Sequence, residues 1–277
     1  MAINYADKYS PLVDEAFTQS ALTQGVINNS YDWIGVEAIK VFSIPVKDWV
    51  DYKLSGSNRY GTPDELENEV QSMMLTQDKS FTFTIDQKSV QDTLGTMVAG
   101  TALAREISQV VIPGIDTYRI SKIVAGVNPS HLTNVTTTKD NAYETFLGLQ
   151  EKLDDAKAPQ GGRVAIVTPA FYNKIKLDSA FTKMGDLATR IALNGQIGTI
   201  DDIPVIKAPT SYFPAGVDVI ITNPIVMPAP VKLTEYKIHS DAPGISGFLV
   251  EGRVRFDAFV LNQKKNAIAV NKVGSGE

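Results

Sequence analysis

The sequence predicts an α+β fold that combines a long two-stranded ribbon, a long amphipathic helix and a mixed region of helices and strands. Apolar and polar residues alternate with the period of a β-strand on both sides of a polar tip at residues 55–69. Apolar residues then recur at helical spacing over residues 87–111. Residues 127–230 alternate between helical and strand patterns, and strand patterns alone follow them.

The composition excludes several kinds of protein. Of the 277 residues, 43% are hydrophobic, as in an ordinary globular protein. Asp and Glu number 31 against 26 Lys and Arg, and no block of like charges is long enough to form a nucleic-acid-binding arm. The absence of cysteine excludes disulfides, thiolate metal sites and cysteine nucleophiles, and it fits assembly in a reducing cytoplasm.

Residues 1–30 are expected to form an N-terminal arm. They contain one short helical pattern, Pro11 to Gln19, with Ser10 as its cap, and too few apolar residues to form a core. We therefore expect the arm to lie across a neighbouring surface. The first residues lack the pattern of an export signal, and the apolar stretch at Val217–Ile221 is far shorter than the roughly 20 residues that cross a bilayer, so no membrane association is expected.

Residues 31–86 are expected to form the ribbon, an extended two-stranded loop. The apolar side chains of the outgoing strand, residues 44–54, share one parity, and so do those of the return strand, residues 72–85. Strands of this length, at roughly 3.3 Å a residue, extend on the order of 35 to 50 Å. Because an isolated two-stranded ribbon is at best marginally stable in water, its apolar face needs a partner surface, which we expect another copy of the chain to supply.

Asp86 is placed to cap a helix that begins the segment 87–126. Pro113 and Gly114 are expected to stop this helix, because proline lacks an amide hydrogen and glycine has a low helix propensity. A second helical pattern, Ile115 to Val124, follows them.

Residues 127–230 are expected to form a separate α/β region. Thr168 and Pro169 suit the cap and the first position of a helix. Helices are predicted at residues 141–156 and 170–177, and strands at residues 164–167, within 194–206 and at 217–222.

Residues 231–277 are expected to return to strands. These are predicted at residues 231–238, 248–261 and 267–270. The polar residues 262–266 are expected to join the last two strands as an antiparallel hairpin.

The sequence predicts no catalytic, cofactor-binding or metal-binding residues, and so no enzyme. The two histidines, His131 and His239, are far apart in the sequence and lack nearby acidic ligand patterns, so we expect them at the surface. Neighbouring acids do not face each other, which makes solvated turns the expected place of the Asp pairs 154–155 and 201–202. No phosphate-binding loop, nucleophile elbow or zinc motif occurs.

Six side chains are candidates for contact between subunits: Trp49, Arg59, Tyr60, Leu66, Phe81 and Phe83. Trp, Tyr and Arg concentrate at binding hot spots, and the apolar face of the ribbon needs a partner. The ribbon lysines are interpreted as solubilising charge rather than as cross-linking groups. They are Lys47, Lys53 and Lys79.

Five ordered segments carry a resemblance to a known family. They are NRYGTPDEL at the ribbon tip, LTQDKSFTFTID entering the helix, VIPGIDTYRISKIVAG leaving it, NGQIGTIDDIPVI in the α/β region and VEGRVRFDAFVLNQKKNAIAV near the end. Together with the order of the elements, they resemble the major capsid proteins of tailed bacteriophages, which have the Hong Kong 97 fold. The resemblance covers essentially the whole chain.

The resemblance implies a peripheral domain with a spine helix, formed by residues 87–126 and 231–277, and an axial α/β domain, residues 127–230. It implies hexamers and pentamers in an icosahedral shell around double-stranded DNA, with weak non-specific contact to the DNA, a portal protein at one vertex, and the extended loop over the adjacent subunit. The expected location is the virion capsid, assembled in the bacterial cytoplasm. Some members carry a long scaffolding segment before the loop, whereas only residues 1–30 precede it here, so a separate scaffolding protein is expected.

Two alternatives remain open. A cellular nanocompartment shell of the same fold would hold an enzyme cargo and would lack DNA, portal and tail. A soluble hydrolase or transferase with an unrecognised site would be a monomer or small oligomer with measurable turnover.

Overall fold

A computed structural model of the full chain gives the fold. It describes residues 21–31, 33, 38–44, 46–63, 65, 69–88, 99–179, 198–240 and 242–273. The chain divides into two compact units, residues 33–75 and the remainder, residues 1–32 with 76–277. We call the first the ribbon unit and the second the main unit, and each is described by itself.

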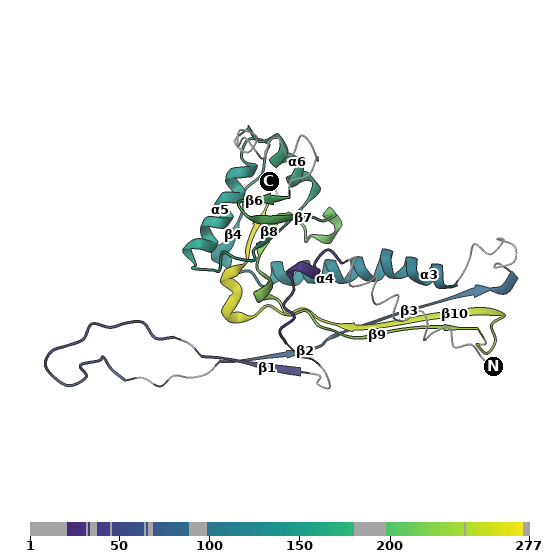
Figure 1. The fold of residues 1–277 in the computed structure, drawn as a ribbon, viewed down its shortest axis with the longest axis horizontal. Coiled ribbons are helices and arrows are strands. Elements are labelled where there is room, and N and C mark those ends of the chain that lie inside the picture. The colour runs from purple at the N-terminus through teal and green to yellow at the C-terminus, as the bar shows by residue number, and fades with distance from the viewer. Residues whose placement is uncertain are drawn as a thin grey trace. The chain divides into compact units, whose positions relative to one another are not determined.

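The ribbon unit is built on two antiparallel strands, β1 (Ala38–Ser43) and β2 (Glu69–Met74), which pair from end to end (Figure 1). Residues 46–63, which lie between them, form no strand. The predicted outgoing strand over residues 44–54 is therefore wrong. Alternation produces a strand only where a second strand supplies hydrogen bonds, and the proline at position 45 lacks an amide hydrogen to donate.

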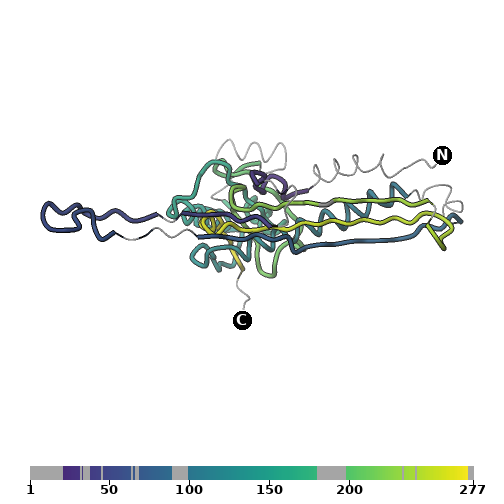
Figure 2. Tube along the Cα trace, turned by 90° about the horizontal axis from the view of Figure 1, so that it is seen from below, coloured from purple at the N-terminus to yellow at the C-terminus, as the bar shows by residue number. Residues whose placement is uncertain are grey.

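The predicted return strand, residues 72–85, is divided between the two units. Its second part, β3 (Gln77–Asp86), belongs to the main unit and pairs along its whole length with β10 (Gly247–Phe256). On its other side β10 pairs with β9 (Val231–His239), so that the blue, yellow and green segments of Figure 2 run side by side. The prediction that residues 72–85 form one strand of the ribbon is therefore wrong. The partner of β3 lies far along the chain, and the local sequence pattern does not indicate such a distant partner.

A long helix packs on this three-stranded sheet. It consists of α3 (Ala99–Glu106), the π-helical turn η2 (Ile107–Val111) and α4 (Ile112–Ala125), which follow one another without a break (Figure 1). The prediction that Pro113 stops the helix is wrong, since Pro113 lies at the start of α4. In a regular helix a proline ring clashes with the carbonyl four residues earlier, and the wider π-helical turn relieves that clash.

The predicted cap at Thr168 is confirmed; Asp86 makes the hydrogen bond predicted of a cap, but residues 89–98 of the helix expected after it lie outside the described residues. The carboxylate of Asp86 accepts a hydrogen bond from the amide of Lys88 (2.8 Å). The hydroxyl of Thr168 accepts one from the amide of Phe171 (3.3 Å). Both satisfy amides that have no partner within a first helical turn.

A second sheet in the main unit has the strand order β4-β11-β8-β5-β7-β6. Its central strand β8 is antiparallel to both β11 and β5, and the outer pairs β5–β7 and β4–β11 are parallel. The strands predicted at residues 164–167 and 217–222 are confirmed. The sheet consists of β4 (Leu132–Thr133), β5 (Val164–Val167), β6 (Thr199–Ile200), β7 (Ile203–Lys207), β8 (Val217–Thr222) and β11 (Ala269–Lys272).

The predicted hairpin near the C-terminus is wrong. Residues 262–266 lie in a short helix, η6 (Asn262–Ala267), and β11 joins the six-stranded sheet rather than β10. The polar composition of this segment suits a hairpin turn and a connection between two sheets equally well, so local chemistry does not decide between them. The remaining short helices are η1 (Gln24–Val26), η3 (Pro129–His131), η4 (Thr210–Tyr212) and η5 (Pro224–Val226).

Three apolar clusters hold the main unit together. The helices α5 (Ala142–Asp155) and α6 (Pro169–Leu177), both predicted, pack on one face of the six-stranded sheet. The second half of α4, through Ile120 and Ile123, packs on the other face. The first half of α4 packs on the three-stranded sheet. One helix therefore contacts both sheets, and the six-stranded sheet includes β11, which lies outside residues 127–230; the division of the main unit into domains stays a prediction.

The described start of the chain is part of the main unit. Val26 is fully buried and Ile27 is nearly so, both in the cluster that contains the second half of α4. The amide of Asn28 donates to the carbonyl of Met227 (2.8 Å). The expectation that this segment lies across a neighbouring surface is therefore wrong for residues 23–28, while the predicted helix at residues 11–19 lies outside the described residues.

Candidate assembly surfaces

The ribbon unit carries most of the large apolar side chains that are exposed in the described part of the chain. Trp49 is 100% exposed and Val46 is 93% exposed. Apolar groups gathered on one part of a surface mark a contact site, whereas single ones are ordinary. The exposed apolar residues of the ribbon unit are Phe42, Ile44, Val46, Trp49, Val50, Tyr52, Leu54, Tyr60, Val70 and Met74.

The tip of the ribbon unit, residues 50–61, is held by its own contacts. The amide of Lys53 donates a hydrogen bond to the carbonyl of Arg59 (3.0 Å). The rings of Tyr52 and Tyr60 pack edge to face with their centroids 5.0 Å apart. The exposed side chains are therefore presented on a defined loop.

Gly61 closes this tip. Its φ is +90°, and its amide donates to the carbonyl of Asn58 (3.0 Å). A Cβ at this position would lie 2.8 Å from the side chain of Val50. Only glycine combines this conformation with this close approach.

The structure separates the six candidate contact residues. Trp49, Arg59 and Tyr60 lie in the ribbon unit with exposed side chains, and the guanidinium of Arg59 donates back to the carbonyl of Gly56 (3.4 Å). Phe81 and Phe83 lie on β3 of the main unit, half-buried against its core. Leu66 lies outside the described residues.

A groove that the sequence did not indicate runs between the long helix and β3 in the main unit. A hollow of about 530 Å³ lies where β3 and β10 face η2 and α4, and one of about 510 Å³ lies where β3 faces α3. Phe81 lines both, and Val110, which is 55% exposed, lines the first. Val110 and Val111 line the groove, but two successive valines do not by themselves indicate one. The groove forms only because β3 pairs with β10 and so lies opposite the helix.

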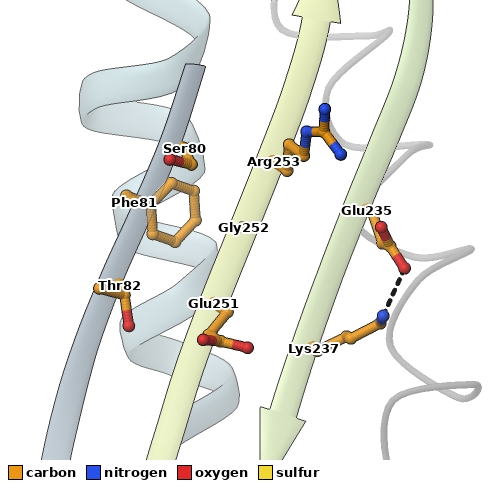
Figure 3. A pocket seen from close by; sticks show the side chains of 8 residues that line it. All are labelled: Ser80, Phe81, Thr82, Glu235, Lys237, Glu251, Gly252 and Arg253. Carbon is orange, nitrogen blue, oxygen red and sulfur yellow. Dashed lines mark ion pairs between the residues drawn. The ribbon is translucent and has the colours of Figure 1, made fainter. Parts of the chain in front are cut away.

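The other face of the three-stranded sheet carries a shallow polar hollow of about 390 Å³ (Figure 3). Side chains alternate between the two faces of a strand, so the polar residues of β3, β9 and β10 gather here. Figure 3 shows charged groups from β9 and β10 around Gly252, which has no side chain.

The charges on this face are paired with one another. The guanidinium of Arg253 donates to both carboxylate oxygens of Asp78 (2.9 and 2.6 Å), and this hydrogen bonding holds the pKa of Asp78 below its ordinary value. Lys237 pairs with Glu235 on the same strand. The hollow therefore has the character of a solvated surface, not that of an acid–base site.

Two buried polar residues of α4 fasten the N-terminal segment. The carboxylate of Asp116 accepts from the hydroxyl of Thr23 (2.6 Å) and from the amide of Leu22 (3.0 Å). The guanidinium of Arg119 donates to the same hydroxyl (3.1 Å) and to the carbonyl of Ala229 (3.3 Å). Burial lowers the pKa of Arg119 to about 10, and the nearby Asp116 opposes that change.

A second buried carboxylate, that of Asp218 on β8, is also held by hydrogen bonds within the fold. It accepts hydrogen bonds from the hydroxyl of Thr137 (2.7 Å) and from the side-chain amide of Asn271 (2.9 Å). Burial raises its pKa, and these hydrogen bonds act in the opposite direction. The carboxylate ties the central strand to its neighbour and to a loop.

The histidine prediction is wrong for one of the two residues. His131 is only 7% exposed, and its Nδ1 lies 3.1 Å from the carbonyl of Ile268. Its burial follows from the position of η3 beside the segment that leads into β11. His239 is partly exposed, as expected, with its Nε2 3.2 Å from the carboxylate of Glu251.

Asp201 and Asp202 lie at a turn, as predicted, whereas Asp154 and Asp155 are the last two residues of helix α5. Asp201 and Asp202 are exposed, with φ values of +46° and +62°. Asp154, at the end of α5, forms an ion pair with the buried Arg163 (2.8 Å). Within the described ranges no three acidic or histidine side chains come together as a metal site. In the same ranges no helix is long and apolar enough to cross a membrane.

The fold matches solved structures from phages and that of a virus-like particle. One structure from Mycobacterium phage Che8 superposes with a TM-score of 0.73 at 16% identity and covers 91% of each chain. The mature capsid of bacteriophage PhiM1 superposes with a TM-score of 0.64 at 9% identity, covering 88% of this chain and 84% of that one. A virus-like particle from Pyrococcus furiosus gives 0.60 at 14% identity, covering 98% of this chain and 100% of that one.

No family model matches the chain, and no curated protein matches it in sequence. The structural matches show that the chain has the mixed helix and sheet fold of phage capsid proteins, which is the fold that the sequence resemblance implied. Each of the three matches covers at least 84% of both chains.

Proposed function

We propose that the chain is the major capsid protein of a tailed bacteriophage, which assembles with copies of itself into an icosahedral shell around double-stranded DNA. The observation that carries this proposal is the exposed apolar surface of the ribbon unit, on a chain with a phage-capsid fold. A two-stranded ribbon with no core of its own gains stability only by covering that surface.

The groove between the long helix and β3 is the surface that we expect a neighbour's ribbon unit to occupy. It offers apolar walls from Phe81 and Val110, together with the charged side chains of Lys79 and Arg105 at its edges. An aromatic side chain buries about 150–250 Å² in such a site, which at about 25 cal/mol per Å² contributes roughly 4–6 kcal/mol before ordering costs. A few such contacts per subunit support a shell.

Closure of the shell follows from the kind of contact. A ribbon unit that binds a different surface on the next copy makes a head-to-tail interface, and such interfaces form rings when the rotation closes. Hexamers and pentamers are the rings that we propose. The partners in this proposal are further copies of the chain, a separate scaffolding protein, a portal protein and the enclosed DNA, with assembly in the bacterial cytoplasm.

The contact with DNA is expected to be weak and non-specific. The chain has a net charge of -5, and two basic side chains on the three-stranded sheet, Lys237 and Arg253, are paired with acidic ones. Strong binding to the phosphate backbone needs unpaired Lys and Arg on one face.

Electron microscopy of the purified full-length chain, with nuclease-protected nucleic acid measured on the same particles, tests the proposal. Closed shells or hexamers are expected. Val110→Asp, which places a charge in the groove, is expected to abolish shells without unfolding the chain, and Val135→Asp, at a second exposed valine, is the matched control. A chain that stays monomeric at high concentration would contradict the proposal.

A second candidate is the shell of a cellular nanocompartment. The observation that favours the nanocompartment shell is that this chain covers 100% of the length of the virus-like particle protein from Pyrococcus furiosus. Particles from the native source that contain a protein cargo, and no nuclease-protected DNA, would decide for the nanocompartment.

An enzyme remains the alternative of another class. The polar hollow in Figure 3 has its charged groups paired and open to solvent, which disfavours catalysis there. A discrete small oligomer with measurable hydrolase or transferase turnover would support it.

A further inference from the structure

We propose that the buried carboxylate of Asp257 is an anchor that fixes the point at which the return strand of the ribbon unit enters the main unit. The ribbon unit ends at Leu75, and Thr76 is the first residue of the main unit after it. Asp257 follows β10 directly and is 1% exposed. The inference rests on the proposed function, because it names a residue that positions the assembly surface.

The carboxylate of Asp257 accepts four hydrogen bonds. Its Oδ2 accepts from the amide and from the hydroxyl of Thr76, each at 2.8 Å. Its Oδ1 accepts from the hydroxyl of Tyr118 (2.7 Å) and from the amide of Ala258 (2.8 Å). Hydrogen bonds to an ionised group are shorter and stronger than neutral ones, so a buried carboxylate with both oxygens engaged holds its donors firmly.

Tyr118 links this anchor to the long helix. It lies on α4, and its ring packs edge to face against Phe256, with the centroids 5.5 Å apart. The ammonium of Lys122 lies 5.2 Å from the same ring centroid. Burial and the hydrogen bond to Asp257 raise the pKa of Tyr118, so its hydroxyl keeps the proton that it donates. Thr76 is thereby joined to an element that packs on both sheets of the main unit.

The two ends of the ribbon unit are held differently. Before the unit, Asn28 is held by its amide on Met227 (2.8 Å) and by its side chain on the carbonyl of Ile225 (3.1 Å), and residues 29–32 then separate it from the start of the unit. After the unit, Thr76 follows Leu75 with no residue between. Thr76, held by Asp257, is therefore the held residue that lies nearest in sequence to the ribbon unit on its C-terminal side.

A fixed point of this kind matters for shell assembly. An extended element can bring its contact surface to a neighbouring subunit only if supporting residues hold the base of that element in a defined position. Asp257 lines neither hollow of the groove, although Tyr118, which donates to it, lines one of them, so Asp257 is a positioning residue. Its effect is expected in the range of positions that the ribbon tip visits.

Electron paramagnetic resonance between two spin labels in the full-length chain measures that range. The chain has no cysteine, so Ser57→Cys at the ribbon tip and Glu144→Cys on α5, both exposed, provide unique labelling sites. Labelled chains are diluted into excess unlabelled chain, so that each distance belongs to one molecule. Thr76→Val removes one of the four hydrogen bonds, and Thr76→Val with Tyr118→Phe removes two.

We expect the distance distribution to broaden in Thr76→Val and to broaden further in the double variant, with a parallel loss of shell yield. Thr84→Val is the matched control, because Thr84 is an exposed threonine on β3, which begins directly after Thr76, and its distribution should equal that of the parent. If the double variant fails to fold, Thr76→Val alone decides, since it keeps three of the four donors.

An unchanged distribution in variants whose thermal midpoint falls would overturn the proposal, because Asp257 would then only stabilise the main unit. The proposed function can fail separately. If the distribution broadens as expected but the parent chain forms no shell, the anchor stands and the capsid reading does not.

Discussion

The main unit and the ribbon unit use apolar side chains in opposite ways. In the main unit Phe146, Phe171 and Ile220 are fully buried in clusters that hold helices onto sheets. In the ribbon unit Trp49 is 100% exposed and Val46 is 93% exposed. The difference teaches that the same residue types stabilise the fold where they are buried and face solvent over most of the ribbon unit, in which Trp33, Met73 and Leu75 are the buried exceptions among the described large apolar residues.

The largest effect is expected from opening the core of the main unit. Phe171→Ala is expected to lower the free energy of unfolding by about 3–5 kcal/mol, because the cavity that it leaves refills only in part. Phe42→Ala in the ribbon unit, where the side chain is 64% exposed, is the matched control and is expected to change it by less than about 0.5 kcal/mol. Urea unfolding measures the change in the free energy of unfolding for both variants. Equal decreases in the two would contradict the contrast between the units.

The next effect concerns assembly alone. Trp49→Ala is expected to leave the thermal midpoint of the unassembled chain unchanged, because its side chain touches solvent. It is expected to weaken each contact between copies by about 2 kcal/mol, roughly thirtyfold in the association constant. Sedimentation of shells measures the loss. Leu177→Ala, at a 69% exposed leucine of the main unit, should assemble like the parent.

A smaller loss of stability is expected from Gly252→Ala in β10. A Cβ there would lie 2.3 Å from the ring of Phe81, so the ring must move and the free energy of unfolding should fall by about 1–3 kcal/mol. Gly148→Ala is the control, since nothing lies within 4 Å of a Cβ at that position in α5. It is expected to raise stability by about 0.5–1 kcal/mol through helix propensity. A gain at both positions would show that the sheet is loosely packed.

The smallest effect is expected from Arg253→Ala on the solvated face of the three-stranded sheet. The hydrogen bond from Arg253 lowers the pKa of Asp78 in the folded chain, so the pair stabilises the fold above the ordinary pKa of an aspartate. This contribution is lost as the pH falls through the lowered pKa. Solvent screens both groups, so the variant should be only slightly less stable at neutral pH and equal to the parent in acid.

Unfolding at several pH values measures this difference. Lys79→Ala, at an exposed lysine next to Asp78 on β3, is the control. Its stability relative to the parent should not depend on pH in this way. A difference for Arg253→Ala that persists at low pH would mean that its side chain acts by packing on the sheet, not by pairing with Asp78.

The local elements of the fold could be predicted from the sequence where chain-local chemistry decides them. The apolar run Val164–Val167 is a buried strand, and Thr168 with Pro169 begins the helix after it, as predicted. The exposed candidates Trp49, Arg59 and Tyr60 could be named as contact residues, although the contacts themselves stay a prediction. The helix through Pro113 could not be predicted, because the π-helical turn that accommodates the proline shows no sequence motif.

The amino-acid sequence determined the type and approximate bounds of most elements, since alternation, helical spacing and capping side chains act over a few residues. Only the tertiary structure decided that β3 pairs with β10, that β11 joins the six-stranded sheet, and that the Asp257 carboxylate accepts a hydrogen bond from the amide of Thr76. Each of these joins residues far apart in the chain. Their pairing depends on which surfaces remain to be buried once the local elements have formed, and no local pattern records that.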